Sequence, residues 1–166
     1  MSIPFLLDEI SVASTRDDKL HLFQLLLSEC SRSKNDNAYL HFLRAAAEQF
    51  SDDPVICIGT AHSIAIVDPE SRQESLDRAV GALELAIRQN RLVKYTATEL
   101  ARISLLLEAY KTLERALTTL ISERNVKRSE DSGYVFDFVD QIDPKRCDGD
   151  LLAQYKQLDR SKQRGR

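Results

Sequence analysis

The 166-residue chain is poor in the residues that interrupt helices and build turns. It contains only four prolines and five glycines, too few for the many turns of a β-sandwich or a β-barrel. No two glycines lie closer than sixteen residues, so the glycine-rich loop that cradles a phosphate is absent. The sequence therefore excludes an all-β fold and nucleotide binding of the phosphate-loop kind.

Cysteines and long apolar runs are also scarce. The three cysteines, Cys30, Cys57 and Cys147, form no CxxC pair and cannot all join disulfides, so we expect free thiols. The longest apolar-leaning run, Val55 to Val67, has thirteen residues, fewer than the roughly 18 that a membrane span needs. Residues 1–10 carry no basic side chain before their apolar patch, unlike a secretory leader. These features predict a cytoplasmic protein with no membrane span.

Charge is nearly balanced, but it is unevenly distributed along the chain. The net charge is -3, and the residues from Asp143 onward carry seven Lys/Arg against four Asp, which leaves residues 1–142 at -6. Duplex binding rests on several cations gathered on one face. An acidic body therefore argues against nucleic acid as the main partner and leaves only the basic tail, residues 160–166, for such a contact.

Apolar residues recur at three- and four-residue spacing along most of the chain, which is typical of amphipathic helices. Residues 96–123 contain no proline or glycine and form either one long helix or two helices joined tightly. Residues 55–58 and 64–67 could instead form two short strands, but a two-stranded sheet is marginal alone, and we favour a helix there. The predicted helices are 16–32, about 37–50, 54–67, about 71–90, 96–123 as one or two, and a last helix from Asp150 to about Leu158.

Helix starts are marked by residues whose side chains can bond to free backbone N–H groups. The possible caps of the first predicted helix are Thr15, Asp17 or Asp18, and Asp53 is followed by proline at the first helical position. Ser71 with Glu74, and Thr96 with Glu99, have the capping-box spacing. We expect those two serine and threonine residues to begin helices.

The predicted helices share a repeat in their sequence. Leu26-Leu27, Thr60-Ala61 and Leu100-Ala101 recur at intervals of 34 and 40 residues in the first helix of each pair. In the second helices the pairs Leu43/Ala46, Leu83/Ala86 and Leu117/Leu120 recur at intervals of 40 and 34. This agreement predicts three helix hairpins.

Residues 20–127 resemble tetratricopeptide-repeat proteins, as a degenerate, TPR-like match. The resemblance is clearest in the segment from Phe42 to Pro54, FLRAAAEQFSDDP, and in Ala79-x-x-x-Leu83-x-x-Ala86-Ile87. It implies an all-α right-handed solenoid of about three stacked antiparallel helix hairpins. It also implies a binding scaffold without catalysis, whose first helices line a groove that holds a partner. The groove-facing residues would then be His21, Gln24, Ser28, His62, Tyr95, Thr98 and Arg102.

Catalytic and metal-binding patterns are weak by comparison. His21, His41 and His62 lie twenty and twenty-one residues apart, without the three- to five-residue spacing of paired ligands, so we expect no metal site. Cys30 and Cys57 lie on apolar stripes. The paired acids lie at helix starts or in links, where they cap the helix or are solvated. We therefore predict no catalytic residue and no cofactor.

The sequence thus predicts a helical-hairpin repeat domain, residues 1–130, followed by a C-terminal appendage, residues 131–166. The predicted function is a non-catalytic interaction module, an adaptor or a small inhibitor or immunity-like protein, that binds another protein or peptide. One alternative is a helical enzyme or small-ligand domain with its site near His21 and His62. Another is a structural subunit that dimerises through residues 134–158. Residues 134–139, in which aromatic side chains alternate, are either extended or helical.

Overall fold

The computed structural model describes residues 2–126 and 139–163, and these residues are helical, with no strand among them. The all-α prediction is therefore confirmed, and the segment 55–67 is part of a helix and not of a sheet. The chain divides into two compact units, residues 1–51 and 52–166. Residues 134–138, for which we left two conformations open, and the boundary predicted at residue 130 lie outside the described residues.

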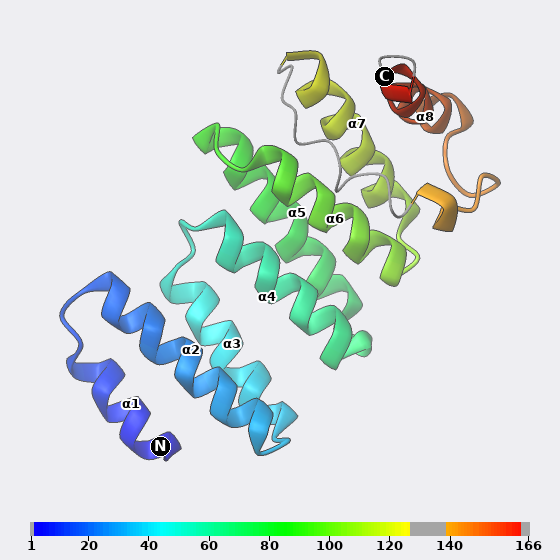
Figure 1. The fold of residues 1–166 in the computed structure, drawn as a ribbon. Coiled ribbons are helices and arrows are strands. Elements are labelled where there is room, and N and C mark those ends of the chain that lie inside the picture. The colour runs from blue at the N-terminus through cyan, green and yellow to red at the C-terminus, as the bar shows by residue number, and fades with distance from the viewer. Residues whose placement is uncertain (1, 127–138, 164–166) are drawn as a thin grey trace. The chain divides into compact units, whose positions relative to one another are not determined.

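The first unit contains three helices, α1 (Ile3–Val12), α2 (Arg16–Arg32) and α3 (Asp36–Gln49) (Figure 1). Helix α1 packs on α2, and α2 packs on α3. The side chain of Thr15 accepts the N–H of Asp18 and that of Asn35 accepts the N–H of Ala38, so both caps satisfy free donors. Sequence analysis missed α1, because residues 1–10 were compared only with a secretory leader and not with a helix of the fold.

Two phenylalanines close the core of the first unit. Phe23 on α2 meets Phe50, which follows α3, edge to face with 6.1 Å between ring centroids, a favoured geometry for aromatic pairs. The guanidinium of Arg16 lies 5.1 Å from the centroid of the Phe50 ring. The ring of Phe50 thus packs on Phe23 and is covered by the guanidinium of Arg16. This cation–π contact links the start of α2 to the end of α3.

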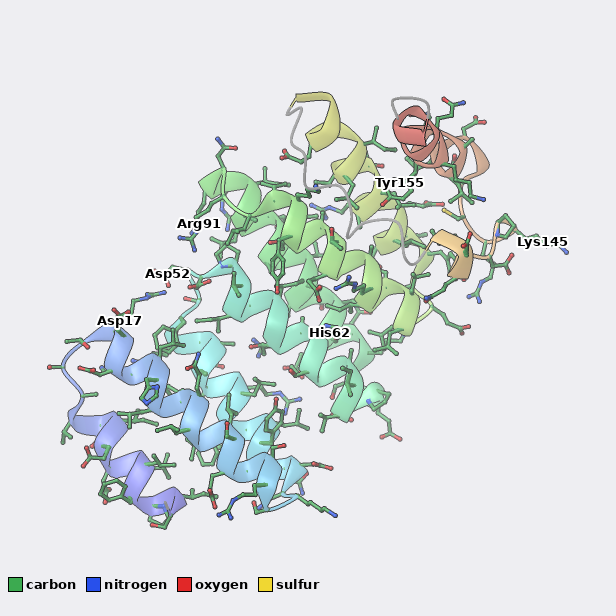
Figure 2. The ribbon with its side chains drawn as sticks, viewed as in Figure 1. Asp17, Asp52, His62, Arg91, Lys145 and Tyr155 are labelled. Atoms are coloured by element: carbon green, nitrogen blue, oxygen red, sulfur yellow. The ribbon has the colours of Figure 1, made fainter. Side chains whose placement is uncertain are left out.

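The second unit contains the remaining helices of the described residues. They are α4 (Pro54–Val67), α5 (Arg72–Gln89), α6 (Val93–Leu106), α7 (Tyr110–Val126) and α8 (Gly149–Gln163), with 3-10 turns at Pro69–Ser71 and Val139–Gln141. Helix α5 packs on both α4 and α6, α4 also packs on α6, α6 packs on α7, and α7 packs on α8. One core of buried Leu, Ile and Ala side chains runs through them and ends at Tyr155 on α8, which is 1% exposed (Figure 2).

One of the expected helix starts is wrong, and at another the expected capping bond is absent. Helix α6 begins at Val93, so Thr96 lies inside it and donates its hydroxyl to the carbonyl of Leu92. Ser71 does precede α5, but its hydroxyl bonds to the carboxylate of Asp68, and no capping bond forms. A serine or threonine followed three residues later by glutamate is a short pattern, and it also occurs inside helices for unrelated reasons.

The segment from 96 onward belongs to two helices, which separate at residues 107–109. Glu108 has φ of +52°, the left-handed conformation, and the N–H groups of Glu108 and Ala109 bond back to the carbonyls of Leu105 and Ser104. This is the Schellman motif that ends many helices.

The predicted start of the last helix at Asp150 is also displaced. Asp148 and not Asp150 caps α8, because the carboxylate of Asp148 accepts the N–H of Leu151.

Candidate functional site

Helices α4 and α6 lie side by side and run in the same direction (Figure 1). Both helices contribute small buried side chains to the shared core, Ala61 and Ala65 from α4 and Ala97 and Ala101 from α6. Alanine at these positions lets two helix backbones approach closely, and the apolar area removed from water stabilises the contact. The side chains at the edges of this seam are left facing solvent on one common side.

The solvent-facing stripes of the two helices have matching registers. On α4 the stripe is Val55, Gly59, His62 and Ile66, and on α6 it is Tyr95, Glu99, Arg102 and Leu106. Each residue on α6 follows its counterpart on α4 by forty positions. We call these eight residues the α4–α6 face.

Large apolar side chains occupy both ends of the α4–α6 face. Val55 and Tyr95 at the start of the stripes are 39% and 46% exposed, and Ile66 and Leu106 at the end are 61% and 52% exposed. Single exposed apolar residues are ordinary on protein surfaces, whereas several gathered on one face mark sites of interaction. Four of the exposed large hydrophobic residues of the described chain therefore belong to one surface.

An ion cluster joins the two helices at the centre of the face. The Nδ1 atom of His62 lies 3.0 Å from Oε2 of Glu99, and Nη1 of Arg102 lies 2.6 Å from Oε1 of the same carboxylate. An ionised carboxylate can only accept hydrogen bonds, so Nδ1 of His62 carries a hydrogen and donates a hydrogen bond to Glu99. The side chain of Glu99 is 12% exposed, against 32% for His62 and 35% for Arg102. The acid is thus sheltered, and its two cationic or donor partners are presented to solvent.

The cluster keeps Glu99 ionised. The hydrogen bond from His62 lowers the pKa of Glu99 most, Arg102 lowers it further, and partial burial opposes both. Burial and the neighbouring negative charge of Glu99 raise the pKa of the Tyr95 hydroxyl. The phenol of Tyr95 therefore stays neutral at physiological pH, as a hydrogen-bonding group beside an ion pair.

A cleft opens at the end of the α4–α6 face, where both helices finish. Its volume is about 540 Å³, and its lining is made of His62, Ile66, Arg102, Leu105, Leu106, Glu108, Tyr110 and Gln141. The guanidinium of Arg146 stacks 4.4 Å from the centroid of the Tyr110 ring and lies 3.5 Å from the carboxylate of Glu108. The cleft combines an apolar wall with a rim of donors, an arrangement suited to a side chain of a partner.

The structure brings together three of the seven groove residues that the sequence predicts, namely His62, Tyr95 and Arg102. Thr98 is buried and donates its hydroxyl to the carbonyl of Lys94, so it offers no side chain to a partner. The other three lie on α2 in the first unit, where they are exposed. They are His21, Gln24 and Ser28.

Sequence analysis missed the acid and the apolar residues of the face. Glu99 was assigned to a capping box, although it holds the ion cluster together. Val55, Ile66 and Leu106 follow from the same forty-residue offset that relates His62 to Arg102, so the signal was present in the sequence. We had used that offset for the buried rows only.

Among the described residues, the side-chain partner of His62 is a carboxylate. The hydrogen bond of His62 goes to Glu99, whereas nucleophilic catalysis requires a histidine within reach of a hydroxyl or a thiol. The thiols of Cys30, Cys57 and Cys147 are free, and burial is the main cause that raises the pKa of each, which makes them poor nucleophiles. Across residues 2–126 and 139–163 no three His, Cys, Asp or Glu side chains are grouped as metal ligands.

Comparison with known proteins gives no relative: no family model, curated protein sequence or solved structure matches the chain. Within the ranges that the structure describes, the helices are too short or too polar to cross a membrane.

Proposed function

We propose that this chain is a non-catalytic protein-interaction module that binds a partner protein or peptide through the α4–α6 face. The observation that carries the proposal is the pair of stripes in matching register, with exposed apolar side chains at both ends and the His62–Glu99–Arg102 cluster between them. Interfaces of this kind draw affinity from a few large side chains, while polar groups with fixed geometry set the orientation of the partner.

The helix order supports a TPR-like stack of hairpins as the architecture behind this face. Within the second unit α4 and α5 form one hairpin and α6 and α7 form the next, and α6 packs on both members of the first hairpin. The repeated pairs Leu83/Ala86 and Leu117/Leu120 are buried in the second helices of these hairpins. A stack built this way leaves its first helices on one side as a continuous binding surface.

An adaptor and a small inhibitor or immunity-like protein are the forms of this function that the chain suits best. Residues 1–142 carry a net charge of -6, which favours encounter with a basic target through long-range attraction. The final hold on that target would come from the apolar ends of the face, because surface charges are screened by salt beyond about 10 Å.

Small-ligand binding in the cleft is a weaker candidate. Its volume falls in the range of ligand pockets, but such pockets bury most of their ligand. Ile66 and Leu106, which form the apolar wall, are each more than half exposed. The wall would thus leave a small molecule in contact with water, whereas a protein partner would cover it.

Capture of partners from the source organism, with quantitative mass spectrometry, tests the proposal. Three full-length baits are compared: the unmodified chain, Leu106→Asp, and the control Ile87→Asp. Ile87 lies on α5, outside the face, and is 49% exposed, close to the 52% of Leu106. We expect a partner that the unmodified chain and Ile87→Asp recover equally and that Leu106→Asp recovers at least about tenfold less. Equal recovery with Leu106→Asp would contradict the proposal.

A further inference from the structure

The α4–α6 face has the same pattern when it is followed from either end. Along α4 the order is apolar Val55, Gly59, His62, apolar Ile66, and along α6 it is Tyr95, Glu99, Arg102, Leu106. Reversing the direction of both helices exchanges Val55 with Ile66 and Tyr95 with Leu106, apolar for apolar. It also exchanges Glu99 with Arg102, an anion for a cation.

This symmetry makes the face complementary to itself. We infer that a second copy of the chain docks on the α4–α6 face, about a two-fold axis that lies in the interface and crosses both helices. Such a rotation places each helix on its own counterpart with reversed direction, and closed two-fold dimers are the commonest oligomers. The inference rests on the proposed function, since it names the partner of the same face.

The apolar ends meet one another in this dimer. Tyr95 of one copy lies opposite Leu106 of the second, and Val55 lies opposite Ile66, so four exposed apolar side chains of each copy are covered at once. Burying apolar area contributes roughly 25 cal/mol per Å². These contacts supply the attraction between the copies.

The centre of the face provides room for the dimer to close. Gly59 is exposed, and apart from its chain neighbours and the nearby backbone of its own helix, a Cβ atom built there would have no atom within 4 Å. The rotation places Gly59 of one copy opposite His62 of the other. The missing side chain therefore leaves a space for the imidazole ring at the point where two helices would otherwise collide.

The charged side chains of the face also match between the two copies, although the net charge of -3 on each copy opposes their long-range encounter. The rotation sets the Glu99–Arg102 pair of one copy against the same pair of the other in the opposite sense, so each cation faces an anion. Both groups are already hydrogen-bonded within their own chain, which reduces the cost of removing them from water. Reversed helices also place opposite dipole ends together.

The size of the face predicts a weak dimer. Eleven residues of helix rise about 17 Å, and two packed helices lie about 9 Å apart, so the covered area is at the low end for a specific interface. We expect a dissociation constant on the order of 10–100 µM. The chain would be largely monomeric when dilute and dimeric when concentrated.

Sedimentation equilibrium of the full chain tests the inference over about 5 µM to 0.5 mM, a range that brackets this expectation. We expect a monomer–dimer equilibrium for the unmodified chain and for the control Ile87→Asp. Leu106→Asp should weaken association at least about tenfold. A single monomeric species at the highest concentration would overturn the inference, as would a dimer that Leu106→Asp leaves unchanged. The latter result would favour association through another surface, such as residues 134–158.

Two substitutions of Gly59 separate loss of the dimer from loss of folding. Open space beside Gly59 lets both Gly59→Ala and Gly59→Gln fold, and either one raises the helix propensity of α4. The long glutamine side chain fills the space that His62 of the second copy needs, whereas a single methyl group leaves most of it. We expect Gly59→Gln to weaken dimerisation at least about tenfold and Gly59→Ala to retain it. Equal association of the two variants would contradict this two-fold arrangement.

The result also separates this inference from the proposed function. If the chain stays monomeric, while capture still depends on Leu106, the face binds another protein and only the second copy is excluded. If neither association nor capture responds to Leu106→Asp, the face itself is not the binding surface.

Discussion

At the scale of single residues, Glu99 determines how the face is built. Its carboxylate accepts from His62 on the neighbouring helix and from Arg102 on its own, and it is the most sheltered of the three side chains. The sequence could not show this role, because the bond to His62 spans 37 residues and depends on how two hairpins pack. By contrast, His62 and Arg102 were among the groove-facing residues that the resemblance to tetratricopeptide repeats implies.

Substitution of Glu99 by glutamine should destabilise the protein by about 1–2 kcal/mol at pH 7, since hydrogen bonds to charged groups are the stronger ones. Equilibrium unfolding in urea measures this free energy. Glu84→Gln is the matched control, because the Glu84–Arg115 pair is largely exposed and exposed ion pairs contribute little. A loss no larger than that of the control would show that the cluster does not hold α4 to α6.

The dependence of the free energy of unfolding on pH in the acid range should also change in Glu99→Gln. The pKa of Glu99 is lower in the folded protein than in the unfolded chain. The unfolded state therefore binds more protons as pH falls, and the stabilisation present above pH of about 4.5 is lost as the folded pKa is passed. We expect the free energy of unfolding of the unmodified chain to fall more steeply below about pH 5 than that of Glu99→Gln. Equal slopes in the two proteins would contradict the assignment.

At the scale of elements, the helix interiors were predictable and several helix ends were not. Thr15, Asp53 and the apolar rows of α2 to α5 gave helices whose bounds differ from expectation by a residue or so. The break between α6 and α7 was not visible, because the left-handed residues that follow α2, α5 and α6 are Lys34, Asn90 and Glu108, and none is a glycine. Backbone carbonyls close these turns, and the local sequence carries no mark of that.

The conformation of Glu108 leads to a stability prediction for the turn. A residue with a Cβ atom at positive φ costs about 1 kcal/mol relative to glycine. Glu108→Gly should therefore be about 1 kcal/mol more stable than Glu108→Ala, since both lose the weak contact with Arg146 and only glycine relieves the backbone. Thermal and urea unfolding of the two variants measure the difference. Equal stability would mean that the turn between α6 and α7 differs from the one described.

At the scale of the whole molecule, composition together with the periodicity of apolar residues was enough for the fold class. Few prolines and glycines, together with helical periodicity, left an all-α fold as the only solution, and the described residues have that fold. The forty-residue offset that suggested repeats also relates the two stripes of the face. What composition could not supply was the set of exposed apolar residues, because exposure is decided by which helix covers which.

The central feature of the molecule is the α4–α6 face, which we propose is covered by another protein. Photo-crosslinking in living cells tests this most directly, with a benzophenone amino acid placed at position 106 or, as the control, at position 87. We predict crosslinked adducts from position 106 and few from position 87, and adducts of twice the chain mass would identify a second copy. Adducts from position 87 alone, or equal yields from both positions, would contradict the claim.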